Sequence, residues 1–460
     1  MRLESLSKEI YDVLGRTRNP APEAVLGILS KAKEKKGLTL DEAGCLLSIT
    51  APELIRELFD TAGWVKNEIY GERLVFFAPL YISDFCVNNC RYCNFHSANA
   101  GLIRRRLSLS QIEEQAQALI NMGHKRILLE AGEDPENNGI DYVVEAIEKI
   151  YSARTQKGNI RRINVNIAAT TVENYRKLKA AGIGTYQLFQ ETYHKPTYEK
   201  LHIGPKHNYR RQINAHIKAF EAGIDDVGIG ALFGLYDWRF ETLALIAHAQ
   251  YLDKEFNVGP HTISVPRFRG APTVDFNPEY SVSDDDFLKI IAVLRVTVPY
   301  TGLILSTREN PRMRSMAFKI GISQASAASC TETGGYGKID ARVSSQSQFN
   351  VQDERKLEEV LLDIVKDGFL PSFCTACYRL NRTGEAFMEL SKPGEIHNFC
   401  RPNGILTFAE YLEDFSTNGI YEKGYALIKH YLAMIEDSQL RGQTEARIKR
   451  IKDGERDLYF

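Results

Sequence analysis

The spacing of apolar residues changes twice along the chain. Residues 1–72 carry apolar positions three to four residues apart, which indicates helices. From Leu74 onward, short apolar runs alternate with longer amphipathic segments, a pattern typical of strands alternating with helices. From about Gln346 this alternation stops and helix-like segments return. The segments predicted as terminal helices are Pro22–Lys35, Leu40–Leu47, Pro52–Gly63, Glu354–Lys366 and Gly424–Lys449.

Eight of the apolar runs are candidate strands. They are Val75–Ile82, Arg126–Glu130, Ile163–Ile167, Thr185–Glu191, Asp226–Phe233, His261–Val265, Gly302–Ser306 and Ser323–Ser329. Eight strand–helix units over about 260 residues match the size of a parallel (βα)8 barrel. A doubly wound sheet is the alternative, but it would show a glycine-rich phosphate-binding turn after its first strand, where this chain has cysteines.

We therefore predict an α/β fold, a parallel eight-stranded (βα)8 TIM-type barrel with helical extensions at both ends. The N-terminal helical extension covers residues 1–72 and the barrel covers residues 73–345. The C-terminal helical domain covers residues 346–460 and carries a second group of cysteines.

Composition and charge exclude several classes of function. The chain has 460 residues, with 58 Lys and Arg against 59 Asp and Glu, so its net charge does not favour nucleic acid or an anionic membrane as partner. The longest apolar stretches, such as Leu74–Ile82, fall short of the roughly 20 residues of a membrane-spanning helix. Met1–Ser5 lacks the layout of a secretory signal. We expect a cytoplasmic protein.

The cysteines are the main chemical signal. Six of the eight form two groups of three, and only Cys45 and Cys330 stand alone. In a reducing compartment such groups indicate metal or iron–sulfur ligands rather than disulfides. The two groups are Cys86, Cys90 and Cys93, and Cys374, Cys377 and Cys400.

The first group lies in one loop directly after the first candidate strand. Cys86, Cys90 and Cys93 can hold three corners of a cubane iron–sulfur cluster and leave one iron open to a small molecule. A zinc site or three unrelated buried thiols are the alternatives. The spacing, with the aromatic Tyr92 just before the third cysteine, resembles the radical S-adenosylmethionine (SAM) superfamily. The resemblance implies that the open iron chelates SAM and that reduction cleaves it.

The same resemblance implies further SAM-binding residues. Ala131-Gly132-Glu133 is similar to the superfamily's Gly-Gly-Glu element, with Ala131 in place of the first glycine. By resemblance Gly132 and Glu133 receive the SAM ammonium group, Glu191 binds the ribose and Arg211 binds the carboxylate. Tyr92 is also predicted to belong to the SAM-binding residues. An ordinary turn at Gly132 and a surface ion pair between Glu191 and Arg211 are the alternatives.

The second group, Cys374, Cys377 and Cys400, indicates either a second iron–sulfur cluster or a zinc site completed by His397. The surrounding segments Phe373–Arg379, Arg382–Met388 and His261–Arg267 resemble the HydG family, the radical SAM tyrosine lyases of [FeFe]-hydrogenase maturation. ThiH-like 2-iminoacetate synthases of thiamine thiazole synthesis share the barrel and the first motif, but lack the C-terminal three-cysteine pattern.

The HydG resemblance implies a reaction. L-Tyrosine is cleaved between Cα and Cβ to p-cresol and dehydroglycine, and the fragment is converted to carbon monoxide and cyanide on an extra iron at an auxiliary 4Fe-4S cluster. His261 matches the protein ligand of that iron. Since His261 opens a strand, the auxiliary cluster must then cap the mouth opposite the SAM cluster; a buried core histidine is the alternative.

A zwitterionic substrate needs a cation for its carboxylate, and arginine binds carboxylate with two parallel hydrogen bonds. Arg308 follows the seventh strand and Ser323 starts the eighth, so they are candidate substrate ligands. A surface ion pair of Arg308 with Glu309 is the alternative. The implied partners are an electron donor protein such as a ferredoxin or flavodoxin, and hydrogenase maturation proteins. A catalytically inactive carrier or scaffold for iron–sulfur clusters is the competing function.

Overall fold

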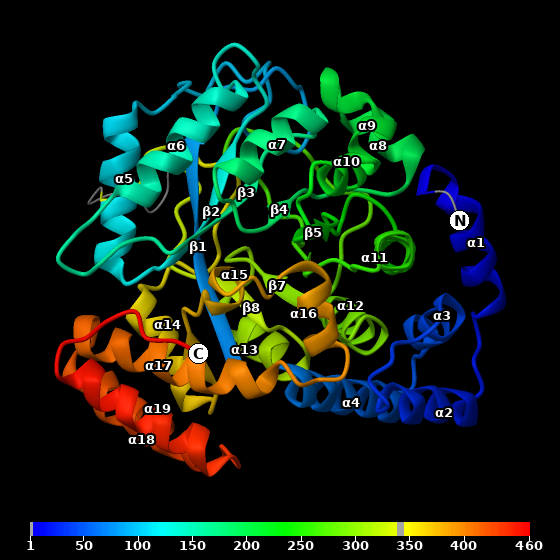
Figure 1. Ribbon diagram of the computed structural model, residues 1–460. Helices are drawn as coiled ribbons and strands as arrows, with labels where there is room; N and C mark the ends of the chain where they lie inside the picture. The colour runs from blue at the N-terminus through cyan, green and yellow to red at the C-terminus, as the bar shows by residue number, and fades with distance from the viewer. Residues whose placement is uncertain (1–2, 338–344) are drawn as a thin grey trace.

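Eight parallel strands close into a barrel in the computed structural model, which describes residues 3–337 and 345–460 (Figure 1). Each strand pairs with the next, and β1 also pairs with β8, so the barrel is closed. The strands are β1 (Arg73–Ser83), β2 (Arg126–Ala131), β3 (Arg162–Asn166), β4 (Tyr186–Gln187), β5 (Val227–Gly230), β6 (Thr262–Ser264), β7 (Gly302–Leu305) and β8 (Gln324–Ser326). The predicted (βα)8 fold is confirmed.

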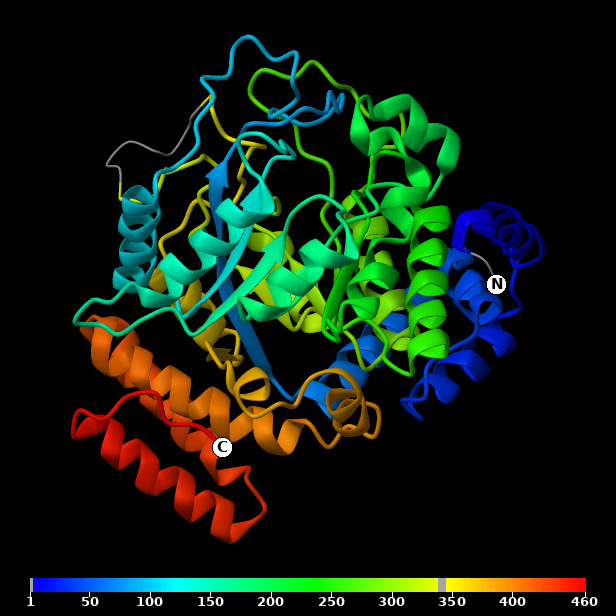
Figure 2. The ribbon, with the colours of Figure 1, turned by 45° about the horizontal axis from the view of Figure 1, so that its top comes forward.

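Helices follow the strands and cover the outside of the barrel (Figure 2). A capping box of Ser108 and Gln111 starts α5, and Gly123 ends it with φ of 103°, a left-handed conformation that glycine adopts without strain. These helices are α5 (Leu109–Met122), α6 (Ile140–Ser152), α7 (Val172–Ala180), α8 (Lys195–Leu201), α9 (Tyr209–Ile213), α10 (Ala215–Glu221), α11 (Trp238–Phe256), α12 (Asp284–Thr297) and α13 (Pro311–Ile320).

The fourth strand is shorter than its apolar run indicates. The run Thr185–Glu191 predicts seven extended residues, but β4 contains only Tyr186 and Gln187. The chain still donates hydrogen bonds toward β5, from the amide of Gln190 among others, until Glu191 turns it away with φ of 69°. The turn brings the Glu191 side chain to the mouth of the barrel.

The segment before β1 is helical and packs against the barrel helices. It contains α1 (Leu6–Arg16), α2 (Pro22–Ala32), α3 (Leu40–Ser48) and α4 (Pro52–Tyr70). Helix α4 packs on α12, and α1 packs on α11. Proline at the first helical position starts both α2 and α4.

The C-terminal segment adds a ninth strand, which the sequence did not predict. β9 (Leu370–Ser372) runs parallel to the first residues of β1, Arg73–Val75. The predicted helix Gly424–Lys449 is two helices, because the chain turns between Met434 and Asp437. The helices are α14 (Leu357–Lys366), α15 (Ala376–Arg379), α16 (Gly384–Ser391), α17 (His397–Phe415), α18 (Asn418–Ala433) and α19 (Ser438–Lys452).

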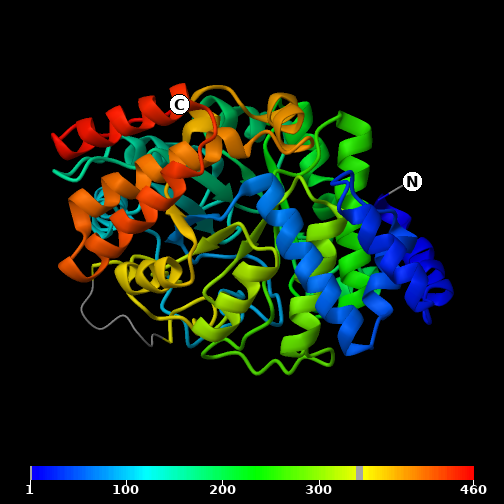
Figure 3. The same ribbon diagram turned by 90° about the horizontal axis from the view of Figure 1, so that it is seen from below.

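Seen from below, α17–α19 and α1–α4 lie on different sides of the barrel's lower end (Figure 3). Helix α17 packs against β9 and β1 there. Within the described ranges, no helix has the length and apolar character needed to cross a bilayer.

Candidate active site and second cysteine group

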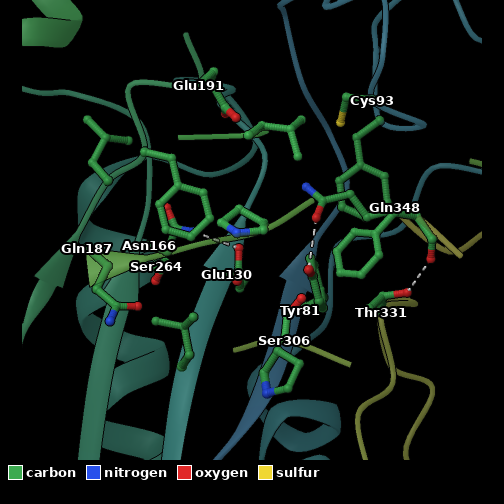
Figure 4. A pocket seen from close by; sticks show the side chains of 18 of the residues that line it. Tyr81, Cys93, Glu130, Asn166, Gln187, Glu191, Ser264, Ser306, Thr331 and Gln348 are labelled. Atoms are coloured by element: carbon green, nitrogen blue, oxygen red, sulfur yellow. Dashed lines mark hydrogen bonds between the residues drawn. The ribbon is translucent and has the colours of Figure 1, made fainter. Parts of the chain in front are cut away.

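A cavity of about 200 Å³ opens at the carboxyl ends of the barrel strands. Residues from every part of the barrel line it, including the three cysteines of the first group and Arg308. Figure 4 shows Glu130, Gln187, Ser264 and Ser306 around its interior. In (βα)8 enzymes this face carries the catalytic residues.

The loop of the first cysteine group is held on both sides of Cys90. The amide of Asn89 donates to the Ile203 carbonyl (2.8 Å), and the amide of Arg91 donates to the Leu201 carbonyl (3.1 Å). Gly132 packs under the start of the loop, where a Cβ atom would lie 2.3 Å from the Phe85 carbonyl oxygen. Glycine is therefore required at position 132 for the loop to lie against β2.

The three thiols of this loop fit a positively charged metal cluster. Burial and, next in size, the neighbouring Cys86 raise the pKa of Cys93 to about 11; burial also raises the pKa of Cys90. Three thiolates this close together need a cation to compensate their charge. No three His, Cys, Asp or Glu side chains in the described part of the chain could hold a single metal ion. A four-iron cluster is larger, and its ligands stand farther apart.

The residues predicted to bind SAM lie beside this loop, in two ion pairs. Arg211, on α9, donates to the carboxylate of Glu133, which also accepts a hydrogen bond from Asn88 Nδ2 (2.6 Å). Glu191 pairs instead with Lys206, at 2.7 Å. The alternative of a direct ion pair between Glu191 and Arg211 is not formed, and all four charged groups stand at the edge of one site.

Tyr92 lines the cavity and is buried. Its hydroxyl lies 2.8 Å from His202 Nε2, while His202 Nδ1 lies 2.7 Å from the Tyr198 carbonyl. Since the carbonyl can only accept, Nδ1 carries the proton and Nε2 accepts from Tyr92. Burial lowers the pKa of His202 to about 3, which keeps this imidazole neutral. The hydroxyl of Tyr92 is therefore committed to positioning the cysteine loop.

Arg308 places a cation in the cavity. Its guanidinium stacks 3.4 Å above the centre of the Phe349 ring. Glu309, the expected surface partner, is instead buried between Arg267 and Arg269. Over residues 3–337 and 345–460, no carboxylate forms an ion pair with Arg308. The guanidinium is thus available to an anionic group of a ligand.

Ser323 is not brought to this cavity. It immediately precedes β8, so it lies at the opposite end of the barrel from Arg308. Its side chain is buried, and its hydroxyl has no hydrogen-bond partner among the described residues. Ser326, at the other end of β8, and Ser306 line the cavity instead. The geometry gives no support to Ser323 as a ligand of the same carboxylate as Arg308.

Several lining residues were not predicted. Burial raises the pKa of Glu130 to about 8, and Asn166 donates a hydrogen bond to its carboxylate (3.2 Å). The hydroxyl of Tyr81 donates to Gln348 Oε1 (2.9 Å; Figure 4). Glu130 ends the second apolar run, and a carboxylate at the carboxyl end of a barrel strand is the signal that could have identified it.

The second group lies at the opposite mouth of the barrel. Cys374 follows β9, Cys377 is in α15 and Cys400 is in α17. Burial first, and then the other two thiols, raise the pKa of Cys377 to about 12. Burial alone would lower the pKa of Arg73, but Cys400 and Cys374 raise it. The thiols therefore face one another next to a cation, and this donor set fits a second iron–sulfur cluster.

His261 lies at the same mouth. Its Nε2 is 2.9 Å from the hydroxyl of Tyr378, the residue after Cys377, and its Nδ1 is 3.4 Å from Asp226 Oδ2. Burial lowers the pKa of His261 well below its usual value, and the nearby arginines, Arg162 first, lower it further. The structure thus brings His261 to the second cysteine group, as the HydG resemblance requires.

The chain is similar to known radical enzymes. Residues 80–247 match the radical SAM superfamily, and residues 264–370 match the biotin and thiamin synthesis associated domain. The 2-iminoacetate synthase of Escherichia coli (strain K12) is 30% identical over 345 residues, covering 75% of this chain and 89% of that protein.

Two solved structures cover nearly the whole chain. A crystal structure of HydG, a maturase of the [FeFe]-hydrogenase, has a TM-score of 0.95 and 50% identity, and the match covers 98% of this chain and 99% of that one. The maturase HydG from Carboxydothermus hydrogenoformans has a TM-score of 0.85 and 42% identity, with 97% and 98% covered.

Proposed function

Because the chain belongs to the radical SAM superfamily, and within it to the HydG maturases, we propose that it cleaves the Cα–Cβ bond of L-tyrosine to p-cresol and dehydroglycine. One observation carries the proposal: the same cavity, at the carboxyl ends of the barrel strands, is lined by three cysteines of one loop and by an arginine that pairs with no carboxylate of the described residues. This combines a site for a radical-generating cofactor with a site for an amino-acid carboxylate.

The cysteine loop and its neighbours form the cofactor half of the site. A 4Fe-4S cluster held by Cys86, Cys90 and Cys93, together with SAM, supplies a carbon-centred radical when bound. Gly132 and Glu133 offer a backbone carbonyl and a carboxylate to an ammonium group. Arg211 and Lys206 offer cations to a carboxylate, and Glu191 can accept hydrogen bonds from ribose hydroxyls.

The other half of the cavity suits tyrosine. Arg308 binds the carboxylate, and its position over Phe349 keeps the guanidinium from turning away. Phe77, Leu128 and Ile304 form a small apolar cluster that lines the interior and can contact the aromatic ring. Glu130, protonated at neutral pH by its raised pKa, can hold or donate a proton at this depth.

The second cysteine group separates a HydG-like reaction from a ThiH-like one. Cys374, Cys377 and Cys400 would hold an auxiliary 4Fe-4S cluster, and His261 would ligate an extra iron. That iron site would supply the place where carbon monoxide and cyanide from the tyrosine fragment are captured for the hydrogenase H-cluster. The contact between His261 and Tyr378 supports this proposal, because it joins the predicted iron ligand to the cysteine segment.

The partners follow from this chemistry. The first cluster needs one electron from a donor protein such as a ferredoxin or flavodoxin, and the iron product is delivered to other hydrogenase maturation proteins. Such oxygen-sensitive clusters fit a cytoplasmic location.

The test is anaerobic reconstitution with iron and sulfide, followed by reduction in the presence of SAM and tyrosine. The proposal expects 5′-deoxyadenosine, p-cresol, carbon monoxide and cyanide. A cluster carrier would form no 5′-deoxyadenosine, and a ThiH-like enzyme would release p-cresol without carbon monoxide. Electron paramagnetic resonance with and without SAM assigns the cluster signals.

A further inference from the structure

The side chain of Asn94 joins the first cysteine loop to a distant part of the chain. Asn94 directly follows Cys93 and is fully buried. Its Nδ2 donates to the backbone carbonyls of Ser345 (3.0 Å) and Ser347 (2.7 Å). Its backbone amide donates to the Gln348 carbonyl (3.4 Å). The residue beside the third cysteine therefore holds a segment that begins 251 positions later in the chain.

Neighbouring side chains fix which atom of the Asn94 amide faces this segment. Asn94 Oδ1 accepts from Asn99 Nδ2 (3.0 Å) and from the Thr273 hydroxyl (2.5 Å). Since Oδ1 is the acceptor of the amide and is engaged on that side, Nδ2 is the atom that points to Ser345 and Ser347. Asn94 therefore uses both polar atoms of its side chain to hold the cysteine loop and the distant segment together.

We call residues 345–349 the bridging segment, and it leads into the cavity. Gln348 and Phe349 line the cavity, whereas Asn94 does not. The Gln348 amide donates to the Thr331 carbonyl (3.0 Å), and the Thr331 hydroxyl donates to the Phe349 carbonyl (3.1 Å; Figure 4). A continuous path of contacts thus leads from Asn94 to the Phe349 ring.

The Phe349 ring supports Arg308, which binds the substrate carboxylate under the proposed function. The guanidinium lies 3.4 Å from the centre of this ring and pairs with no carboxylate of the described residues. The bridging segment contains no helix or strand, so these local contacts set its position. A cation that is already held in place loses less conformational freedom when a ligand binds, and it therefore binds the ligand more tightly.

We propose that Asn94 is a positioning residue for the tyrosine carboxylate. It holds the bridging segment, and the segment holds the Phe349 ring against Arg308, so the guanidinium is preorganised. The inference rests on the proposed function, because preorganisation of Arg308 matters only if a carboxylate binds to it. The cysteine loop then serves both halves of the site, the cofactor through its thiols and the substrate through Asn94.

Three variants break this path. An ionised aspartate in Asn94→Asp keeps the acceptor for Asn99 and Thr273 but donates to neither carbonyl, and Asn94→Ala removes both functions. Phe349→Leu breaks the path at its other end. Each variant is made alone and combined with Arg308→Gln. Formation of p-cresol is measured on reconstituted protein with dithionite as reductant, over a range of tyrosine and SAM concentrations.

The matched control is Asn138→Ala. Asn138 Nδ2 also bridges two backbone carbonyls, those of Phe85 (2.8 Å) and Gly132 (3.0 Å), at the start of the same loop. The substitution removes a bridge of the same kind on the cofactor side, so the KM for tyrosine should equal that of the wild type.

We expect each of the three variants to raise the KM for tyrosine about three- to tenfold, the change in affinity that one or two net hydrogen bonds control. The kcat, the KM for SAM and the iron content should stay at wild-type values, because the loop keeps its three thiols. In the Arg308→Gln background none of the variants should raise the KM further, since the path ends at the guanidinium that has been removed. A merely structural role in the loop would lower kcat and iron content instead.

Three results would overturn the inference. An unchanged KM for tyrosine in the Asn94 variants or in Phe349→Leu would show that the path does not act on substrate binding. Effects that add fully to that of Arg308→Gln would show that Asn94 does not act through Arg308. Loss of iron from both Asn94 variants would assign Asn94 to the stability of the cysteine loop. Absence of p-cresol from the wild type would instead contradict the proposed function itself.

Discussion

His261 and Tyr378, far apart in the sequence, share a hydrogen bond of 2.9 Å between Nε2 and the phenol hydroxyl. The lowered pKa keeps the imidazole neutral, and Nδ1, which faces Asp226 Oδ2 at 3.4 Å, carries its one proton, so Nε2 accepts from Tyr378. A neutral imidazole is also the form that binds ferrous iron. The same atom can therefore serve either a structural hydrogen bond or a metal.

Paired variants distinguish these two roles. His261→Ala should keep both clusters and p-cresol formation but lose most of the additional iron and of the carbonyl–cyanide product. Tyr378→Phe should retain that iron, because it frees Nε2 without removing it. Iron per chain and melting temperature are measured together. A His261→Ala protein that melts earlier yet keeps its full iron content would be a core-packing variant and would contradict the ligand assignment.

Cys90→Ala should abolish cleavage of SAM. The loop has only three thiols for the cluster, while the fold is stabilised by the extended core of the barrel. We expect 5′-deoxyadenosine to fall below detection with little change in circular dichroism. Cys45→Ala, at a cysteine outside both groups, is the control and should match the wild type. Wild-type rates in Cys90→Ala would remove this loop from the mechanism.

Cys374→Ala combined with Cys377→Ala should separate the two halves of the reaction. If only the first cluster is needed to cleave tyrosine, the double variant still forms p-cresol but delivers no carbon monoxide to an iron product. p-Cresol is measured by chromatography and iron-bound carbonyl by infrared spectroscopy. Loss of p-cresol from a folded double variant would show that the two sites do not act independently.

Arg308→Gln should raise KM for tyrosine roughly ten- to a hundredfold, because a charge-assisted hydrogen bond contributes about 1.5–3 kcal/mol. Arg308→Lys should recover part of the loss by keeping the charge without the planar fork. Arg269→Gln is the control, since Arg269 pairs with Glu309 and does not line the cavity. An unchanged KM in Arg308→Gln would assign the carboxylate to another group.

Glu241 holds the turn that follows Glu191 and should make stability pH-dependent. Its buried carboxyl contacts the Thr192 hydroxyl and accepts from the Tyr193 amide (2.8 Å), and burial raises its pKa to about 8. The pKa of Glu241 is higher in the folded state than in the unfolded state. Its contribution to the free energy of unfolding is therefore complete below about pH 4.5 and is lost as pH rises through 8. The loss is about 1.4 kcal/mol for each unit by which the two pKa values differ.

Glu241→Gln tests this dependence, because glutamine can also donate to Thr192 and accept from Tyr193. Its free energy of unfolding, from urea titrations between pH 5 and 9, should fall less with rising pH than that of the wild type. Glu241→Leu should be about 1–3 kcal/mol less stable than the wild type near pH 5, because it leaves the Tyr193 amide unpaired, and this difference should shrink as pH rises. Parallel curves for wild type and Glu241→Gln would mean that Glu241 is ionised throughout.

The sequence was most informative where a motif is local. Cys86, Cys90 and Cys93 lie within one loop, so their proximity follows from the sequence alone. Strand order was also predictable, because each apolar run pairs with the next. Lys206 was missed as the partner of Glu191, since the chain must pass through all of α8 before the two meet.

Strand ends were the main source of error. Ser323 was grouped with Arg308 because the two flank neighbouring strands, but the direction of a strand decides which mouth of the barrel a residue reaches. Glu130 was correctly placed in its strand, but its position near the carboxyl end, which brings it to the cavity, was not recognised. β9 has three residues, too few for a periodic pattern, and its pairing with Arg73 is set by tertiary contacts.

The pairing of β9 with the start of β1 also bears on the order in which the chain can mature. The first cysteine loop lies within a few residues of the carboxyl end of β1, so its ligands are near one another as soon as that loop emerges during synthesis. The second group comes together only after Leu370 has paired with Arg73 and α17 has packed against β9 and β1. These contacts join residues very far apart in the sequence, so they form late. A nascent chain thus brings its first three cysteines together well before the second three can meet.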